Sequence, residues 1–523
     1  MKSFSLTISC CAWLALTLVG ATCSTASAND LQTIVTDLAA LGDRSTGSDG
    51  AAAAATYIEN YFATRGLAPG IYKFPIPVRE VGDSVLEVNG KTIALTPLLY
   101  NAITPQTVTE MEGAPLYYVK DGALEHLDGK LINGAILLMD FTSGRNWLTA
   151  ASLGAQAVIY IDDGRTVANS FFREKEELSP IQFPCFWMEK ERADVLFGKL
   201  AEYQNGLVGD NATINSRITW RNHSAENIYT VIEGRDPELK DELIIIEAFY
   251  DSTRYVAGRS PGADEALSVA NLLQLADHFT YNPPGRSIML VATAGHAQSL
   301  HGMRDLIWSL QERSKLLRDQ ERELKKTIRQ SKSGIALLDE LSFPLQADME
   351  RDRQLATVIG NDLKFTIDQI SRRLMNLRLQ QSESADQNLI DTLAKRRFAL
   401  RQLSWQSTFH DLDKQHQQLL VDLLPTVRRT MESRIADSSE RLATLESARD
   451  FRALTREFDE IAATVSLHLS SHGDGVGGFN RGWLYQLRPR INRTAIFSTM
   501  AEVLQTAATA PVGTCLLYTS LSG

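Results

Sequence analysis

The chain has 523 residues, of which 44% are hydrophobic and 22% are charged. A chain of this length is long enough for two or more domains, and its ordinary composition argues against a largely disordered protein. The formal net charge of −10 argues against nucleic acid as a partner, because proteins that bind nucleic acids present a basic surface to the phosphates.

Residues 1–28 have the pattern of a secretory signal peptide. Lys2 gives the basic start, Cys11–Val19 the apolar core, and Ala26–Ala28 a cleavage site of small residues. The apolar run is too short to span a membrane comfortably, so we predict no transmembrane segment in this chain. The pattern predicts an exported protein, periplasmic or extracellular.

The globular part is predicted to begin with residues 29–110. Leu41–Gly50 is a polar loop, and an alanine-rich helix follows it as far as Gly66. Residues 84–100 contain short β-like runs with alternating apolar positions. We therefore predict a helix followed by short strands.

Residues 111–222 are predicted to form a β-rich insert. Asp128–Asp140 is a turn that leads into a buried strand, Trp147–Ala151 is helical, and Gly154–Ile161 is the next strand. Cys185 has no pairing partner in this pattern, so it is expected to be a buried thiol.

Residues 223–311 contain two apolar runs with a predicted helix between them. Leu243–Ala248 and Ile288–Ala292 suit central parallel strands that are buried on both faces. Asp251 follows the first run and His296 follows the second. Open α/β sheets place their sites at the carboxyl ends of such strands, so these two residues are expected near the same edge.

Residues 312–459 are predicted to form a long α-helical insertion. Apolar residues recur there at helical spacing, β-branched runs are few and charged residues are many. Gly334, Pro344 and Pro425 are predicted to separate at least three long helices. We interpret the insertion as a self-contained bundle, with a partner-binding coiled coil as the alternative.

Residues 460–511 are predicted to return to the core. Val465–Gly478 is an alternating strand that runs into a glycine-rich turn. Residues 512–523 look like a sequencing-adapter artefact, which predicts that the natural protein continues beyond this chain. A native hydrophobic tail is the alternative.

Several of these stretches together resemble the M28 family of zinc aminopeptidases. They are Asn227–Pro237, Glu247–Ser252, Pro261–Asp264 and Val291–Gly295. The resemblance covers most of residues 35–305 and implies an α/β fold in which a mainly parallel sheet is flanked by helices. Residues 111–222 resemble the protease-associated (PA) domain of exported peptidases, which implies a lid that gates or binds substrate.

The resemblance also implies a two-zinc site, but most of its ligand positions are substituted here. In the family the ligands are a His, a bridging Asp, a Glu, an Asp and a late His. Asp264 opens the predicted helix and keeps the bridging carboxylate, so it is the candidate metal ligand. The first His position is Phe249, the Glu-Glu pair is His296-Ala297, and the later Asp position is Ser470.

Asp251 and His296 are the candidate catalytic residues. Asp251 corresponds to the family residue that orients the missing histidine, and His296 stands where the family has its general base. Phenylalanine and alanine cannot coordinate a metal. Zinc is therefore implied by resemblance but is expected to bind weakly or not at all.

Three functions are compatible with these substitutions. The first is a pseudo-peptidase that binds peptides or a protein partner in the cleft. The second is an active M28-type metallo-aminopeptidase with a remodelled metal site, in which His296, His301, His472 and Asp474 converge near the strand ends. The third is a structural or interaction protein that acts through the helical insertion and a helix-mediated partner.

Overall fold

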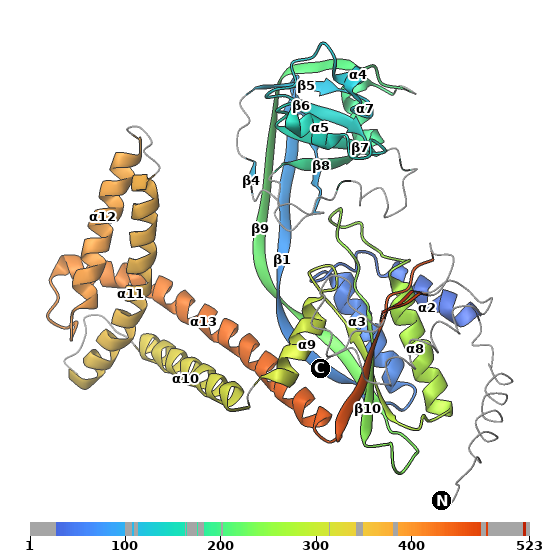
Figure 1. Cartoon of the computed structure of the whole chain (residues 1–523). Helices are drawn as coiled ribbons and strands as arrows, with labels where there is room; N and C mark the ends of the chain where they lie inside the picture. The colour runs from blue at the N-terminus through green and yellow to red at the C-terminus, as the bar shows by residue number, and fades with distance from the viewer. Residues whose placement is uncertain are drawn as a thin grey trace, which may run out of the picture. The chain divides into compact units, whose positions relative to one another are not determined.

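The computed structural model divides the chain into two compact units (Figure 1). One comprises Met1–Leu310 and Asp450–Gly523, and the other comprises Gln311–Arg449. The residues whose structure is described are 28–99, 107–108, 113–162, 164, 175, 183–199, 202–312, 314–340, 349–379, 385–471, 477–479 and 516–518.

Three parallel strands form the centre of the sheet in the first unit. They are β10 (Glu242–Phe249), β11 (Ser287–Thr293) on one side of it and β12 (Glu460–Leu467) on the other. Every residue of β11 is buried. The prediction that 243–248 and 288–292 form neighbouring central strands is confirmed, because unbroken apolar runs suit strands covered on both faces.

A long antiparallel ribbon extends the sheet beyond β11. It consists of β9 (Gly206–Ile232), which pairs with β11, and β1 (Gly70–Val88), which pairs with β9 and then with β2 (Lys91–Ala94). The sequence pattern predicted only short β-like runs, within residues 84–100, and β1 also contains Pro75 and Pro77. Both prolines have exposed side chains, and proline is confined to strand positions that need no ladder donor. The sheet as a whole is mixed.

Four helices flank this sheet, as predicted for the α/β class: α2 (Ala28–Ala40), α3 (Asp49–Ala63), α8 (Ala266–Tyr281) and α9 (His301–Gln311). α8 packs on β10 and β11, and α3 contacts α8 and β9. α3 begins after Ser48, whose hydroxyl accepts a hydrogen bond from the Ala51 amide at 3.1 Å. This is the usual role of an N-cap serine.

A smaller lobe lies in the chain between β1 and β9. Its strands β5 (Ala114–Tyr118), β6 (Ile136–Asp140), β7 (Ala157–Asp162) and β8 (Cys185–Glu189) are parallel in that order. Successive residues of β6 and β7 enter two different apolar clusters, so both faces of this sheet are covered. β9 runs without a break through residue 222, and the limits of the insert and its PA assignment stay predictions.

The remaining short elements complete the first unit. They are β3 (Thr96–Pro97), β4 (Thr107–Val108), β13 (Gly477–Phe479), β14 (Leu516–Tyr518), α4 (Leu124–Leu127), α5 (Trp147–Ser152) and α7 (Lys190–Phe197). Cys185, at the start of β8, is buried, as predicted. The signal-peptide prediction for 1–28 lies almost entirely outside the described residues.

The second unit is built from long helices, so the predicted helical insertion is confirmed. They are α10 (Ser314–Asp339), α11 (Met349–Leu379), α12 (Ala385–Ser404) and α13 (Lys414–Thr455). Their buried cluster includes Ile359, Leu400 and Leu423, which come from three different helices. Among the helices that the structure describes, none is both long and apolar enough to cross a membrane.

The prediction that Gly334 and Pro425 separate helices is wrong, because both lie inside helices. A Cβ at Gly334 would lie 2.9 Å from the Met431 sulfur, so glycine here permits close approach of α10 to α13. Pro425 removes the donor for the carbonyl of Val421, a residue whose side chain is 38% exposed. Pro344 lies outside the described residues.

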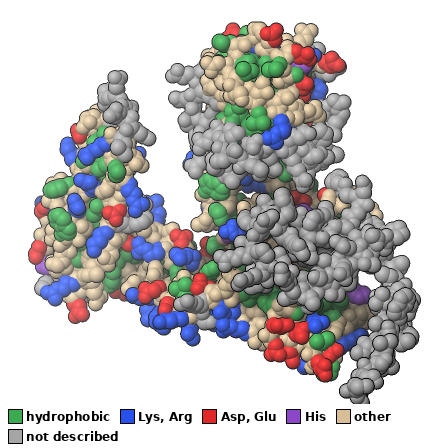
Figure 2. Space-filling model, in the orientation of Figure 1, with side chains coloured by type: hydrophobic (Ala, Val, Ile, Leu, Met, Phe, Trp, Pro, Cys, Tyr) green, Lys and Arg blue, Asp and Glu red, His purple; other side chains and the backbone are tan. Residues whose placement is uncertain are grey.

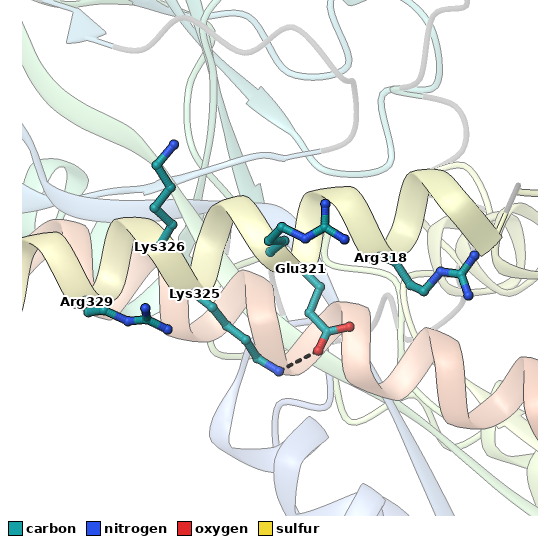
Figure 3. A pocket seen from close by; sticks show the side chains of 6 residues that line it. Arg318, Glu321, Lys325, Lys326 and Arg329 are labelled. Atoms are coloured by element: carbon teal, nitrogen blue, oxygen red, sulfur yellow. Dashed lines mark hydrogen bonds and ion pairs between the residues drawn. The ribbon is translucent and has the colours of Figure 1, made fainter.

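The exposed side of α10 carries a row of basic side chains, which gather on the surface in Figure 2. Arg318, Lys325, Lys326 and Arg329 line a shallow hollow with Glu321 (Figure 3). Glu321 accepts hydrogen bonds from Lys325 at 2.5 Å and from Arg449 of α13 at 3.1 Å, and these contacts lower its pKa. The hollow is therefore part of the contact between α10 and α13.

Two side chains on α11 give a matched test of the packing in the second unit. Ile359 is fully buried, whereas Met375 is 63% exposed. We expect Ile359→Ala to lower the free energy of unfolding by about 2–5 kcal/mol and Met375→Ala by less than about 0.5 kcal/mol. Urea unfolding followed by far-ultraviolet circular dichroism measures both, and equal losses would contradict the described core.

Candidate functional site

The carboxyl ends of β10, β11 and β12 meet at one edge of the sheet, because the three strands are parallel. Asp251 lies two residues after β10, His296 three residues after β11, and His468 directly after β12. The loop before α3 joins them, since Ser45 pairs with Ser252. The structure therefore brings the two predicted catalytic residues to one edge.

Asp251 is a buried carboxylate that ties three chain segments together. Its side chain accepts hydrogen bonds from the Thr46 hydroxyl and from the Gly295 amide, the latter at 2.5 Å. Burial raises the pKa of Asp251 to about 6, and the hydrogen bonds from Thr46 and Gly295 oppose that rise. The carboxylate thus holds the loop before α3 against the ends of β10 and β11.

Arg44 supplies a buried cation beside this acid. Its side chain is fully buried, and its guanidinium donates to three backbone carbonyls of the loop between β10 and α8, those of Tyr250, Pro261 and Gly262. Burial lowers the pKa of Arg44, while the charges of Glu265 and Asp251 raise it. The cation therefore fixes the loop that carries Asp264.

Three rings fill the space between the strand ends. The Phe249 ring stacks on the His296 ring, with 3.8 Å between centroids and 16° between planes. His468 meets both rings edge-on, at 5.2 Å from Phe249 and 5.0 Å from His296. Burial, with a smaller contribution from His468, lowers the pKa of His296 to about 4, so this imidazole is neutral near neutral pH.

Asp264 is held by the loop after β12. Its Oδ2 accepts a hydrogen bond from the Ser470 hydroxyl at 2.8 Å, and its Oδ1 accepts from the Ser471 amide and hydroxyl, both at 2.6 Å. Both carboxylate oxygens are therefore engaged by protein donors. These two oxygens are the atoms that would bridge two metal ions.

The other sequence candidates are two that the structure describes, Ala297 and His301, and two that it does not. Ala297 is exposed and carries no donor atom. His301 begins α9, and its ring stacks on Phe74 of β1 with 5.7 Å between centroids. His472 and Asp474 lie outside the described residues.

Two polar residues of the site were not singled out from the sequence. Glu247, inside β10, is buried and accepts hydrogen bonds from the hydroxyls of Thr293 and Ser466 on the neighbouring strands. Burial raises its pKa. An acid inside an apolar run was the available signal for Glu247. For His468 the signal was its place directly after a strand.

The side chains at this edge do not fit a two-zinc centre. Zinc requires imidazole, thiolate or carboxylate donors, three or four for each ion. Phe249 and Ala297 have none, Ser470 has only a hydroxyl, and that hydroxyl already donates to Asp264. Across the described part of the chain, no three His, Cys, Asp or Glu side chains form a group that could hold a metal ion.

The raised pKa of Asp251 predicts a pH dependence of stability. Between its ordinary value of 3.8 and about 6, the folded state binds more protons than the unfolded state, so the free energy of unfolding falls as pH rises. Compared with Asp251→Asn, the unaltered protein should lose about 3 kcal/mol between pH 4 and pH 7. Urea titrations across this range measure the difference.

Asp83→Asn is the matched control for that titration, because Asp83 is an exposed acid of the same unit. It should keep the pH dependence of the unaltered protein. If the stability of the unaltered protein relative to Asp251→Asn stays constant, or rises, from pH 4 to pH 7, the buried, proton-binding Asp251 is contradicted.

Comparisons with known proteins find similarity to one peptidase family and to several solved peptidase structures. Residues 227–325 match the model of Peptidase family M28. No curated protein matches the chain. BSAP, a zinc aminopeptidase from Bacillus subtilis, is 19% identical over 55% of this chain and 66% of its own, with a TM-score of 0.38.

Two further solved structures give similar values. An aminopeptidase from Aneurinibacillus sp. strain AM-1 is 20% identical over 56% of this chain and 68% of its own, with a TM-score of 0.33. A peptidase M28 precursor from Shewanella amazonensis SB2B is 19% identical over 52% and 65%, with a TM-score of 0.35. The chain spans about two thirds of the length of these structures. The chain thus resembles Peptidase family M28 over residues 227–325.

Proposed function

We propose that this chain is an exported pseudo-peptidase, whose M28-like cleft binds peptides or a protein partner without two-zinc hydrolysis. The observation that carries the proposal is the set of contacts at Asp264. Ser470 and Ser471 donate three hydrogen bonds to its two oxygens. A bridging carboxylate must present both oxygens to metal ions. In Asp264 these oxygens accept hydrogen bonds from the two serines instead.

The ring cluster supports the same proposal. Phe249 places an apolar ring where the resemblance implies a ligating nitrogen, and that ring lies 3.8 Å from His296. His296, which stands at the position of the general base, has a pKa lowered to about 4 by burial. General bases work best with a pKa near the operating pH. His296 is therefore a weak base in these surroundings.

Peptide binding requires neither a metal ion nor a general base, whereas two-zinc hydrolysis requires both. The edge offers the partly exposed acids Asp264 and Glu265 and the exposed Ser471. The β-rich lobe contacts the loop between β10 and α8, because the Leu99 amide donates to the Tyr255 carbonyl at 2.9 Å. We propose that this PA-like lobe acts as a lid that gates the ligand.

The proposal predicts low zinc content and no aminopeptidase activity. Elemental analysis of the full chain, exposed to excess zinc and then freed of unbound metal, should find far fewer than two equivalents. Aminoacyl substrates should not be hydrolysed above background, and Asp264→Ala should change neither result. Peptide binding, measured by calorimetry, should be the same before and after treatment with a chelator.

The opposite result would establish the alternative of an active metallo-aminopeptidase with a remodelled site. That result is near two equivalents of zinc, with activity abolished by Asp264→Ala. His296 and His468, whose rings lie 5.0 Å apart, would then be the first residues to examine as replacement ligands. Asp83→Ala serves as the surface control in both assays.

A second function, interaction through the helical unit, is supported by exposed aromatic side chains at the end of α12. Phe398, inside α12, is 62% exposed, and Trp405, directly after α12, is 73% exposed. Arg401 lies between them, with its guanidinium 5.9 Å from the Trp405 ring centroid. Exposed Trp, Phe and Arg are the side chains that anchor protein interfaces.

A genetic comparison separates the two functions. We expect a gene encoding Asp264→Ala to restore function in a deletion strain if the helical unit carries it. The double variant Phe398→Ser and Trp405→Ser should then fail, although both positions are exposed and the fold is kept. If the double variant restores function at a normal protein level, the exposed aromatic residues at the end of α12 do not carry that function.

A further inference from the structure

Two arginines meet beside the candidate site. Arg79 lies on β1, and Arg254 lies three residues after Asp251 in the loop between β10 and α8. Arg254 Nη1 donates to the Arg79 carbonyl at 2.6 Å, and Arg79 Nη2 donates to the Leu99 carbonyl at 2.8 Å. Both guanidinium groups thus use backbone carbonyls, and the side chains are held in one place.

The guanidinium of Arg254 is incompletely satisfied. Its Nε is buried and has no hydrogen-bond partner within the part of the chain that the structure describes. A buried donor without an acceptor costs about 1–3 kcal/mol. Such a donor beside a second cation suits an added acceptor, and preferably an anion.

The nearby acids are already engaged. Asp43 and Glu80 are the charges that raise the pKa of Arg254, against the larger lowering that burial causes. Asp43 accepts from the Ser45 and Gly258 amides at 2.9 and 2.8 Å. Glu80 lies 3.1 Å from Arg221, and its other oxygen lies 3.4 Å from His223.

Burial and the two like charges also act on Arg79. Burial, with a smaller contribution from the charge of Arg254, lowers its pKa to about 10. The guanidinium of Arg79 lies 5.7 Å from the ring centroid of Trp220, whose side chain is 45% exposed. The pair therefore has an aromatic wall on one side, and the loop that carries Asp251 on the other.

We propose that Arg79 and Arg254 form a binding site for a carboxylate of the peptide ligand. This inference rests on the proposed function, because it assigns the chemistry of one end of the bound peptide. Guanidinium groups match the planar carboxylate and bind it through two parallel hydrogen bonds. The carboxylate is either the carboxyl terminus of the peptide or an acidic side chain.

Three synthetic peptides distinguish these two sources. They are tetra-alanine with a free carboxyl terminus, the same peptide as its carboxyl-terminal amide, and an Ala-Ala-Glu-Ala amide. Calorimetry with the full chain measures the dissociation constant of each. We expect one of the two carboxylate-bearing peptides to bind at least about tenfold tighter than the tetra-alanine amide, since a charge-assisted pair contributes more than about 1.4 kcal/mol.

Arginine substitutions test whether the preference for a carboxylate arises from Arg79 and Arg254. Arg254→Gln and Arg79→Gln should each abolish the tenfold difference between carboxylate and amide. Arg217→Gln, which removes an exposed cation from the same ribbon, should keep it. Thermal unfolding of each variant checks the fold, and the comparison of peptides on the unaltered chain does not depend on any variant folding.

The outcomes separate this inference from the proposed function. Equal binding of all three peptides would overturn the carboxylate site and leave the peptide-binding function standing. A carboxylate preference that survives both arginine substitutions would also overturn it. Failure of every peptide to bind the unaltered chain would overturn the proposed function and the inference together.

Discussion

One buried carboxylate holds the site together. Asp251 accepts hydrogen bonds from Thr46, in the loop before α3, and from Gly295, in the loop after β11. Its own backbone continues β10. Three segments far apart in the sequence therefore meet at one acid, and the rings and carboxylates around it take their positions from those segments. Charge-assisted hydrogen bonds of this kind are strong enough to orient several loops at once.

The cost of burying this acid shapes its surroundings. A buried carboxylate raises its pKa unless donors and cations compensate for lost water. Arg44 provides a fully buried cation, and its guanidinium spans the carbonyls of the same loop. Glu247 solves the same problem with two hydroxyls from the adjacent strands, Thr293 and Ser466. Buried acids therefore lie both inside β10, at Glu247, and just after its end, at Asp251.

The sequence predicted the helices and central strands better than the side-chain contacts between them. Unbroken apolar runs identified β10 and β11, because burial on both faces leaves a strong pattern. The length of β1 was missed, since its prolines contradict strand propensity and only pairing with β9 explains them. His468 was overlooked, although it lies directly after a strand, because the sequence does not show that its ring meets Phe249. The contacts of Asp264 depend on a loop about 200 residues away, which local patterns do not describe.

The contacts of Asp264 follow from hydrogen bonding. A carboxylate without donors would leave its lone pairs unsatisfied and would destabilise the fold. Ser470 and Ser471 supply three hydrogen bonds to its two oxygens. At the same edge, the Phe249 ring stacks on the His296 ring. The two serines thus fix the loop after β12 to the loop that carries Asp264, and hydrogen bonding alone accounts for this arrangement.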